Sequence, residues 1–136
     1  MSTQTFFIPF LLPSLNDMLS SARASKGKWQ AYDQRKHVIE RNIGLVLKKA
    51  KVQAVVEPVE IAYTWREKEA RRDPDNVACG AKYIHDTLVA TGILGGDSVR
   101  YIRGLHHDYC INSRAPGVHV TIRTVGAKDN AEHEPV

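Results

Sequence analysis

The chain has 136 residues, 19 Lys and Arg against 15 Asp and Glu, and a net charge of +4. This length suits one domain rather than two large lobes. We find no apolar run near the roughly 20 residues that span a bilayer, so no membrane association is expected. Two cysteines, Cys79 and Cys110, lack a short pair spacing, which predicts free thiols and a cytoplasmic protein.

The first half of the chain is predicted to hold a strand, an arm and a helix. Residues 5–10 are apolar and β-branched or aromatic, as in a strand. Residues 12–28 are polar and basic and predict a flexible basic arm. Residues 31–52 predict a helix, because four apolar residues share one stripe at helical spacing: Ile39, Ile43, Val46 and Ala50.

The second half is predicted to alternate strands with one more helix. Residues 59–65 alternate apolar and polar side chains, as in a half-buried strand. Residues 74–91 predict a helix whose core-facing stripe is Val77, Ala81, Ile84 and Leu88. Two further strands are expected at 99–109 and 118–123, joined by a turn at 113–117.

The β-α-β-α-β-β order predicts an α/β (α+β) single domain, a mixed sheet flanked by two helices. The domain is expected to span residues 1–124. Residues 125–136 are polar and carry a net charge of −2, and they predict a disordered acidic tail.

The positive charge is concentrated in one segment. Residues 21–51 hold nine Lys and Arg against two Asp and Glu, a net charge of +7. Such a cluster is typical of proteins that bind polyanions such as DNA. A solvated helix face explains it equally well.

Four aspartates follow within 25 residues, with arginines beside them: Asp73, Asp75, Asp86, Asp97, Arg71, Arg72 and Arg100. Carboxylates that converge from two loops are suited to Mg²⁺, which prefers oxygen ligands. A metal held in this way activates water at a phosphodiester, and arginines bind phosphate. The alternatives are structural: Asp73 caps a helix that starts at Pro74, Lys82 and Asp86 form a surface pair, and Gly-Gly-Asp is a turn.

Three blocks in this region resemble the RusA family of Holliday junction resolvases. The first block, Arg72 to Asn76, is similar to the family's R-D-x-D-N element. The second, Lys82 to Leu88, is similar to its K-x-x-x-D-x-L helix, and the third, Gly92 to Val99, to its glycine- and aspartate-containing loop. In the third block Gly96 stands where the family often has a second acid.

The resemblance implies a small α/β homodimer that acts on DNA with Mg²⁺ as its cofactor. It implies that Asp73, Asp75 and Asp97 bind the metal and form the catalytic centre, that Lys82 assists, and that Arg72 holds DNA. Arg71 is expected to bind an adjacent phosphate, and the basic arm is expected to add phosphate contacts through Arg23, Lys26 and Lys28.

The resulting hypothesis is a Mg²⁺-dependent endodeoxyribonuclease that resolves four-way junctions by paired cuts in DNA recombination and repair. Two alternatives stay open: a branched-DNA-binding protein without cleavage activity, and a related nuclease for flaps or forks. His106 and His107 are adjacent on a predicted strand, so they point to opposite faces and do not predict a shared metal. Tyr63 and Trp65 are expected in the core.

Overall fold

The computed structural model describes residues 2–24 and 29–126, and for residues 21–24 and 29–33 it describes the backbone alone. Four strands form one sheet in the order β1-β4-β2-β3. Strand β4 is antiparallel to both β1 and β2, whereas β2 and β3 are parallel. The bounds are Thr3–Ile8 for β1, Val59–Arg66 for β2, Ile102–Cys110 for β3 and Gly117–Thr124 for β4. The sheet is therefore mixed, as expected.

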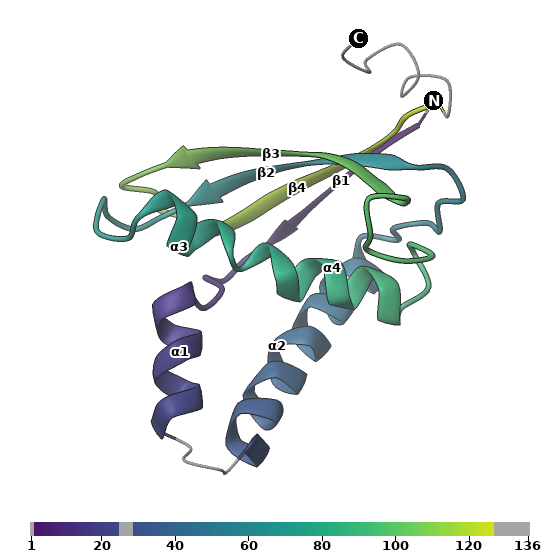
Figure 1. Ribbon diagram of the computed structural model, residues 1–136. Helices are drawn as coiled ribbons and strands as arrows, with labels where there is room; N and C mark the ends of the chain where they lie inside the picture. The colour runs from purple at the N-terminus through teal and green to yellow at the C-terminus, as the bar shows by residue number, and fades with distance from the viewer. Residues whose placement is uncertain (1, 25–28, 127–136) are drawn as a thin grey trace, which may run out of the picture.

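Four helices lie on one face of this sheet (Figure 1). They are α1 (Leu15–Ala24), α2 (Trp29–Lys49), α3 (Pro74–Ala78) and α4 (Ala81–Ala90). The core fills the space between the helices and the sheet. In β2 the predicted alternation is confirmed, since the apolar positions are buried: Val59, Ile61, Tyr63 and Trp65. The small α+β domain is thus confirmed. Helix α2 corresponds to the helix predicted over residues 31–52, α3 and α4 divide the helix predicted over residues 74–91, and α1 lies where an arm was expected.

The expectation of a flexible arm at residues 12–28 is wrong for residues 12–24, the part of this segment that the structure describes. Leu12 is 3% exposed and belongs to the core, and α1 begins three residues later. The backbone amide of Asp17 donates to the Ser14 hydroxyl at 3.2 Å, and the Ser14 amide donates to the Asp17 carboxylate at 3.0 Å. This reciprocal cap satisfies two backbone donors at the start of the helix, so the chain here is ordered.

The helix expected over residues 74–91 breaks at Cys79 and Gly80. A Cβ at Gly80 would lie 3.0 Å from the Leu12 Cβ and 3.3 Å from Cζ3 of Trp65. A side chain at this position would therefore crowd Leu12 and Trp65, and glycine avoids this where the chain passes close to the core between α3 and α4. The predicted apolar stripe is nevertheless buried across both helices: Val77, Ala81, Ile84 and Leu88.

The end of the described chain is attached to the sheet. Val125 is 4% exposed, and its amide donates to the Pro58 carbonyl at 2.8 Å, so the predicted tail does not begin at residue 125. Residues 127–136, where the rest of that tail is expected, lie outside the described residues. Strands β3 and β4 follow one another in the chain, yet β2 lies between them in the sheet. No helix in the described part is both long and apolar enough to cross a membrane.

Candidate active site

Two predicted metal ligands, Asp73 and Asp75, lie at the start of α3, and we call them the acidic pair. Asp73 occupies the N-cap position with extended backbone (φ −74°, ψ 148°), and its carbonyl accepts the Val77 amide at 3.0 Å. Its carboxylate makes no capping hydrogen bond. Both side chains are exposed, and within residues 2–24 and 29–126 neither carboxylate has a hydrogen-bond or ion-pair partner. The backbone of Asp73 starts the helix, but the carboxylates of the pair remain free for a ligand.

The start of α3 is held against the end of β3. The Tyr109 hydroxyl donates to the Pro74 carbonyl at 3.1 Å, and Pro74 separates the two aspartates. Burial, and to a lesser degree the nearby negative charge of Asp75, raise the pKa of Tyr109, so its hydroxyl remains a donor at neutral pH. The acidic pair is therefore positioned by the sheet although its carboxylates are solvated.

The other predicted catalytic residues belong to a second group, which we call the lysine cluster. Lys82 Nζ lies 3.0 Å from Asp86 Oδ1 and 3.6 Å from Asp97 Oδ2, and Lys36 Nζ lies 3.3 Å from Asp86 Oδ2. The hydrogen bond to Asp86 is the main cause of a raised pKa for Lys82. The Lys82 side chain is 66% exposed and stays protonated, so it is suited to bind phosphate rather than to accept a proton.

His85 lies beside the lysine cluster, and both His85 and His107 bond to the aromatic core. The Tyr63 hydroxyl and His85 Nε2 share a hydrogen bond, and Trp65 Nε1 donates to His107 Nδ1 at 2.9 Å. The Tyr63 and His107 rings stack with their centroids 5.0 Å apart. Burial lowers the pKa of both histidines below the ordinary 6.5, so both rings are neutral at neutral pH.

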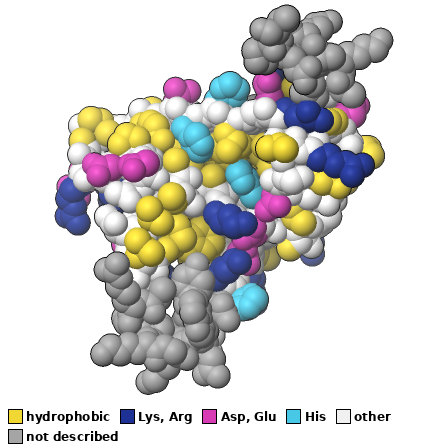
Figure 2. All heavy atoms as spheres, in the orientation of Figure 1, with side chains coloured by type: hydrophobic (Ala, Val, Ile, Leu, Met, Phe, Trp, Pro, Cys, Tyr) yellow, Lys and Arg dark blue, Asp and Glu magenta, His cyan; other side chains and the backbone are white. Residues whose placement is uncertain are grey.

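A pocket of about 400 Å³ opens beside these groups. His85, Asp97 and Arg103 supply polar atoms to its lining, and Ile102 and Leu105 supply apolar ones. Histidine, lysine and acidic side chains gather near the centre of the molecular face over α4, whereas a separate acidic group lies at the α3 end (Figure 2). The pocket therefore adjoins the lysine cluster rather than the acidic pair.

The three predicted aspartate ligands do not form one metal-binding group within the described residues, where no set of three or more His, Cys, Asp or Glu side chains is arranged to hold an ion. Asp97 is paired with Lys82 instead. The acidic pair alone still fits Mg²⁺, because this ion usually takes one or two carboxylates and completes its shell with water and substrate phosphate.

The arginine predictions have different outcomes. The Arg72 side chain is 24% exposed, but its guanidinium is bound by the protein. Its Nε and Nη2 donate to the two Glu67 carboxylate oxygens at 2.6 and 2.8 Å, and its Nη1 donates to the Leu12 carbonyl at 3.1 Å. These bonds make Arg72 a structural anchor rather than a free phosphate ligand. The Arg71 side chain is 83% exposed and pairs weakly with Glu69 at 3.7 Å. Arg23 lies in α1, but its side chain, like Lys26 and Lys28, is outside the described residues.

The missing second acid at Gly96 has a steric reason. A Cβ at Gly96 would lie 2.5 Å from Cε2 of Tyr101, and one at Gly95 would lie 2.9 Å from Cε1 of the same ring. The Tyr101 ring therefore occupies the space that an aspartate at position 96 would need. In this chain the loop before β3 is built around that ring.

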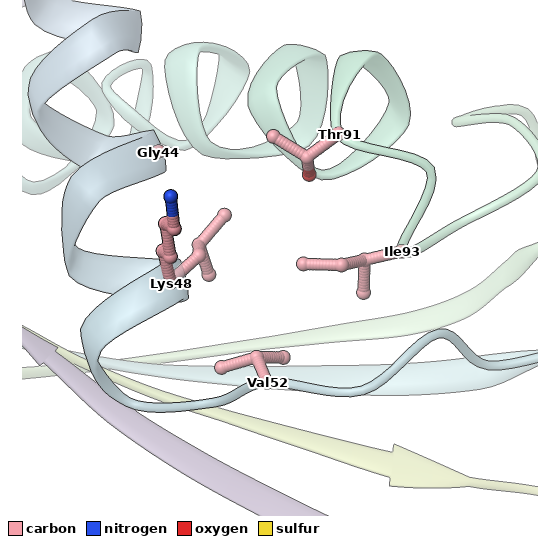
Figure 3. A pocket seen from close by; sticks show the side chains of 6 residues that line it. Gly44, Lys48, Val52, Thr91 and Ile93 are labelled. Carbon is pink, nitrogen blue, oxygen red and sulfur yellow. The ribbon is translucent and has the colours of Figure 1, made fainter.

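A further pocket of about 290 Å³ lies between α2 and the end of α4 (Figure 3). Leu47, Val52 and Ile93 line it, with Lys48 and Thr91 as the charged and polar side chains. The Thr91 hydroxyl already donates to the Thr87 carbonyl at 2.7 Å. Since few polar atoms converge here, we assign no chemistry to this pocket.

Sequence reasoning missed the hydrogen bonds that His85 and His107 make. One signal was present: Tyr63 and Trp65 were expected in the core, and a buried hydroxyl or indole N–H needs a polar partner.

No protein-family model matches this chain, and no curated protein matches it.

Proposed function

We propose that this chain is a Mg²⁺-dependent endodeoxyribonuclease that cuts four-way DNA junctions, the activity of the RusA family that its three sequence blocks resemble. One observation carries the proposal. Asp73 is the N-cap residue of α3, but its carboxylate makes no capping hydrogen bond. Asp75 is a second exposed carboxylate without a partner in the described part of the chain. A purely structural explanation for these aspartates would require the capping bond that Asp73 lacks.

Asp73 and Asp75 would hold the ion. Bound there, Mg²⁺ would supply a nucleophilic water and neutralise charge on the phosphate. Both side chains are exposed, so an ion and a DNA phosphate can reach the two carboxylates from solvent.

The chain's own cations would orient the DNA strand. Lys82 is protonated and largely exposed, and Asp97 on one side and Asp86 on the other hold its ammonium group in place. In this proposal Asp97 positions Lys82, which departs from the direct metal ligand expected from the sequence. Arg71 adds an exposed guanidinium two residues before Asp73. These contacts position phosphates and carry no base specificity.

The reaction further implies a cellular setting and an assembly. Resolution of a junction needs two symmetric cuts, which a two-fold dimer with one site per subunit supplies. We place the activity in DNA recombination and repair, in the cytoplasm of a bacterial or phage-infected cell, as the family resemblance implies.

The test uses the full chain and a labelled synthetic four-way junction, with a linear duplex of the same sequence as control. With Mg²⁺ we expect paired nicks in the junction and little cutting of the duplex. Chelation of the metal should abolish the nicks and leave binding in place. Equal cutting of both substrates would contradict the junction proposal, and faster cutting of flaps or forks would reassign the substrate.

A branched-DNA-binding protein without cleavage activity is the second candidate. The pairing of Asp97 with Lys82 favours it, because the predicted third ligand is then engaged elsewhere. Tight junction binding without nicks under Mg²⁺ and Mn²⁺ would support this candidate and reject the nuclease.

A further inference from the structure

Strand β3 forms one edge of the sheet (Figure 1). Apolar side chains on and just beyond this strand are exposed. It is nine residues long and contains neither Lys nor Pro, two residues that commonly protect an edge. Leu105 is 46% exposed, Tyr109 39%, and Ile111, just beyond the strand, 54%. At the other edge, β1 is shorter and its exposed side chains are the threonines Thr3 and Thr5.

The backbone of β3 is also prepared for another strand. The Cys110 carbonyl accepts the Glu67 amide at 2.8 Å, so the polar backbone groups of residue 110 face β2. These groups alternate in direction along a strand. Those of Leu105, His107 and Tyr109 therefore face the open edge, where the described part of the chain supplies no strand.

We propose that a second copy of this chain pairs with β3 in antiparallel fashion, with the two-fold axis at His107. In this register Leu105 of each copy lies opposite Tyr109 of the other on the helix-covered side of the sheet. His106 lies opposite Asp108 on the open side. Both are favourable cross-strand pairs, an aliphatic side chain against an aromatic ring and an imidazole donor against a carboxylate.

The neighbouring registers are less complementary. An axis at Asp108 would place that carboxylate opposite its own copy, and like charges directly opposite are destabilising. An axis at His106 would place Asp108 opposite Gly104 and remove the Leu105 contact with Tyr109. A strand from an unrelated protein need not match β3 at all, whereas β3 complements itself, so the second copy is the occupant that the sequence of the edge favours.

This dimer brings the acidic pairs onto one surface. A two-fold axis between antiparallel edge strands runs perpendicular to the sheet, so both copies keep their helices on the same face. Tyr109 lies two residues from the axis and bonds to Pro74 between the two aspartates. The two acidic pairs would then flank the axis on one face. The interface is argued from β3 alone, but paired cutting in the proposed function needs such an arrangement.

The first experiment measures mass in solution by sedimentation for the full chain and two variants. Leu105→Lys puts a charge on the edge, and Leu45→Lys is its matched control, because Leu45 is an exposed leucine (58%) on α2. We expect a dimer for the unaltered chain and for L45K, and a dissociation constant for L105K raised at least tenfold. A monomer for the unaltered chain would overturn the proposal.

The second experiment tests the register and does not depend on the stability of L105K. In the proposed dimer Gly104 lies opposite Cys110 of the other copy, so Gly104→Cys should form an intermolecular disulfide on mild oxidation. The three atoms nearest to a Cβ at Gly104 all belong to the flexible Glu60 side chain, the closest at 3.3 Å. The cross-link should vanish when Cys110→Ser is added. A dimer that does not form this disulfide would overturn the proposed register. A dimer unaffected by L105K would overturn the assignment of β3 as the interface. Junction nicking is scored separately, so a dimer that does not cut would reject the nuclease and leave this interface standing.

Discussion

At the scale of single residues, two neighbours in the chain have opposite roles. The Arg72 guanidinium pairs with Glu67, whose side chain is 8% exposed, and donates a hydrogen bond to the Leu12 carbonyl. Asp73 supplies only its backbone to the fold. The Arg72 side chain is therefore structural, whereas the Asp73 carboxylate remains available as a candidate metal ligand.

Replacing Arg72 should therefore destabilise the fold. Arg72→Ala leaves the Glu67 carboxylate buried without its partner, and we expect the free energy of unfolding to fall by about 2–3 kcal/mol. Arg71→Ala removes an exposed cation and should change it by less than about 0.5 kcal/mol. Urea unfolding measures both. Equal stability of the two variants would show that the ion pair with Glu67 contributes little.

Replacing Asp73 should leave the stability of the fold unchanged but abolish the activity. Asp73→Asn removes no capping bond, so the free energy of unfolding should change by less than about 0.5 kcal/mol. Junction nicking should nevertheless be lost, since the neutral amide is a poor Mg²⁺ ligand. A loss of stability near 1 kcal/mol, the usual cost of a lost cap, would indicate a structural role for this aspartate.

The histidines give the fold a dependence on pH. Burial lowers the pKa of His85 and His107 below 6.5 in the folded state, so the unfolded chain binds these protons more tightly. The contribution of the two histidines to the free energy of unfolding should be complete above about pH 6.5 and fall as the pH drops below that value. His107→Gln should flatten the dependence, because it removes one of the two groups whose pKa is lowered in the folded state. Urea titrations across this pH range measure it, and an unchanged slope in H107Q would contradict it.

At the scale of elements, local patterns in the sequence predicted strands and core faces well and helix ends less well. The alternation of β2 and the stripe through α3 and α4 follow from periodicity alone. The Ser14–Asp17 cap was a local signal for α1 that the basic composition of the segment obscured. Gly80 is itself a local signal for a break, since glycine is a poor helix former. The close approach of Leu12 and Trp65 to this glycine has no local signature, because both residues are distant in sequence.

Two glycines should respond oppositely to alanine. Gly80→Ala places a Cβ 3.0 Å from that of Leu12, and we expect it to cost about 1–3 kcal/mol. Gly44→Ala places its Cβ in ordinary contact, 4.0 Å from Thr87, within α2. Helix propensity should then raise stability by about 0.5–1 kcal/mol. Thermal unfolding compares the two, and a stabilised G80A would contradict the packing argument.

At the scale of the whole molecule, the sequence located the candidate residues but not their grouping. The aspartate blocks predicted carboxylates that converge from two loops on one metal ion. The path of the loop after α4 depends on the Tyr101 ring packed against Gly95 and Gly96, and that path leaves Asp97 next to Lys82. Such long-range packing has no signature in spacing, and so the predicted three-aspartate centre became an acidic pair and a lysine cluster.

The most direct test of the central claim is the rate of junction nicking by Asp75→Asn beside Glu57→Gln. Both substitutions remove one exposed carboxylate, but Glu57 precedes β2 and lies at the end of that strand away from α3. With Mg²⁺ present, we expect D75N to bind the junction at least as tightly as the unaltered chain and to nick it at least a hundredfold more slowly. E57Q should cut at the unaltered rate. Undiminished nicking by D75N would contradict the assignment of the acidic pair as the metal site.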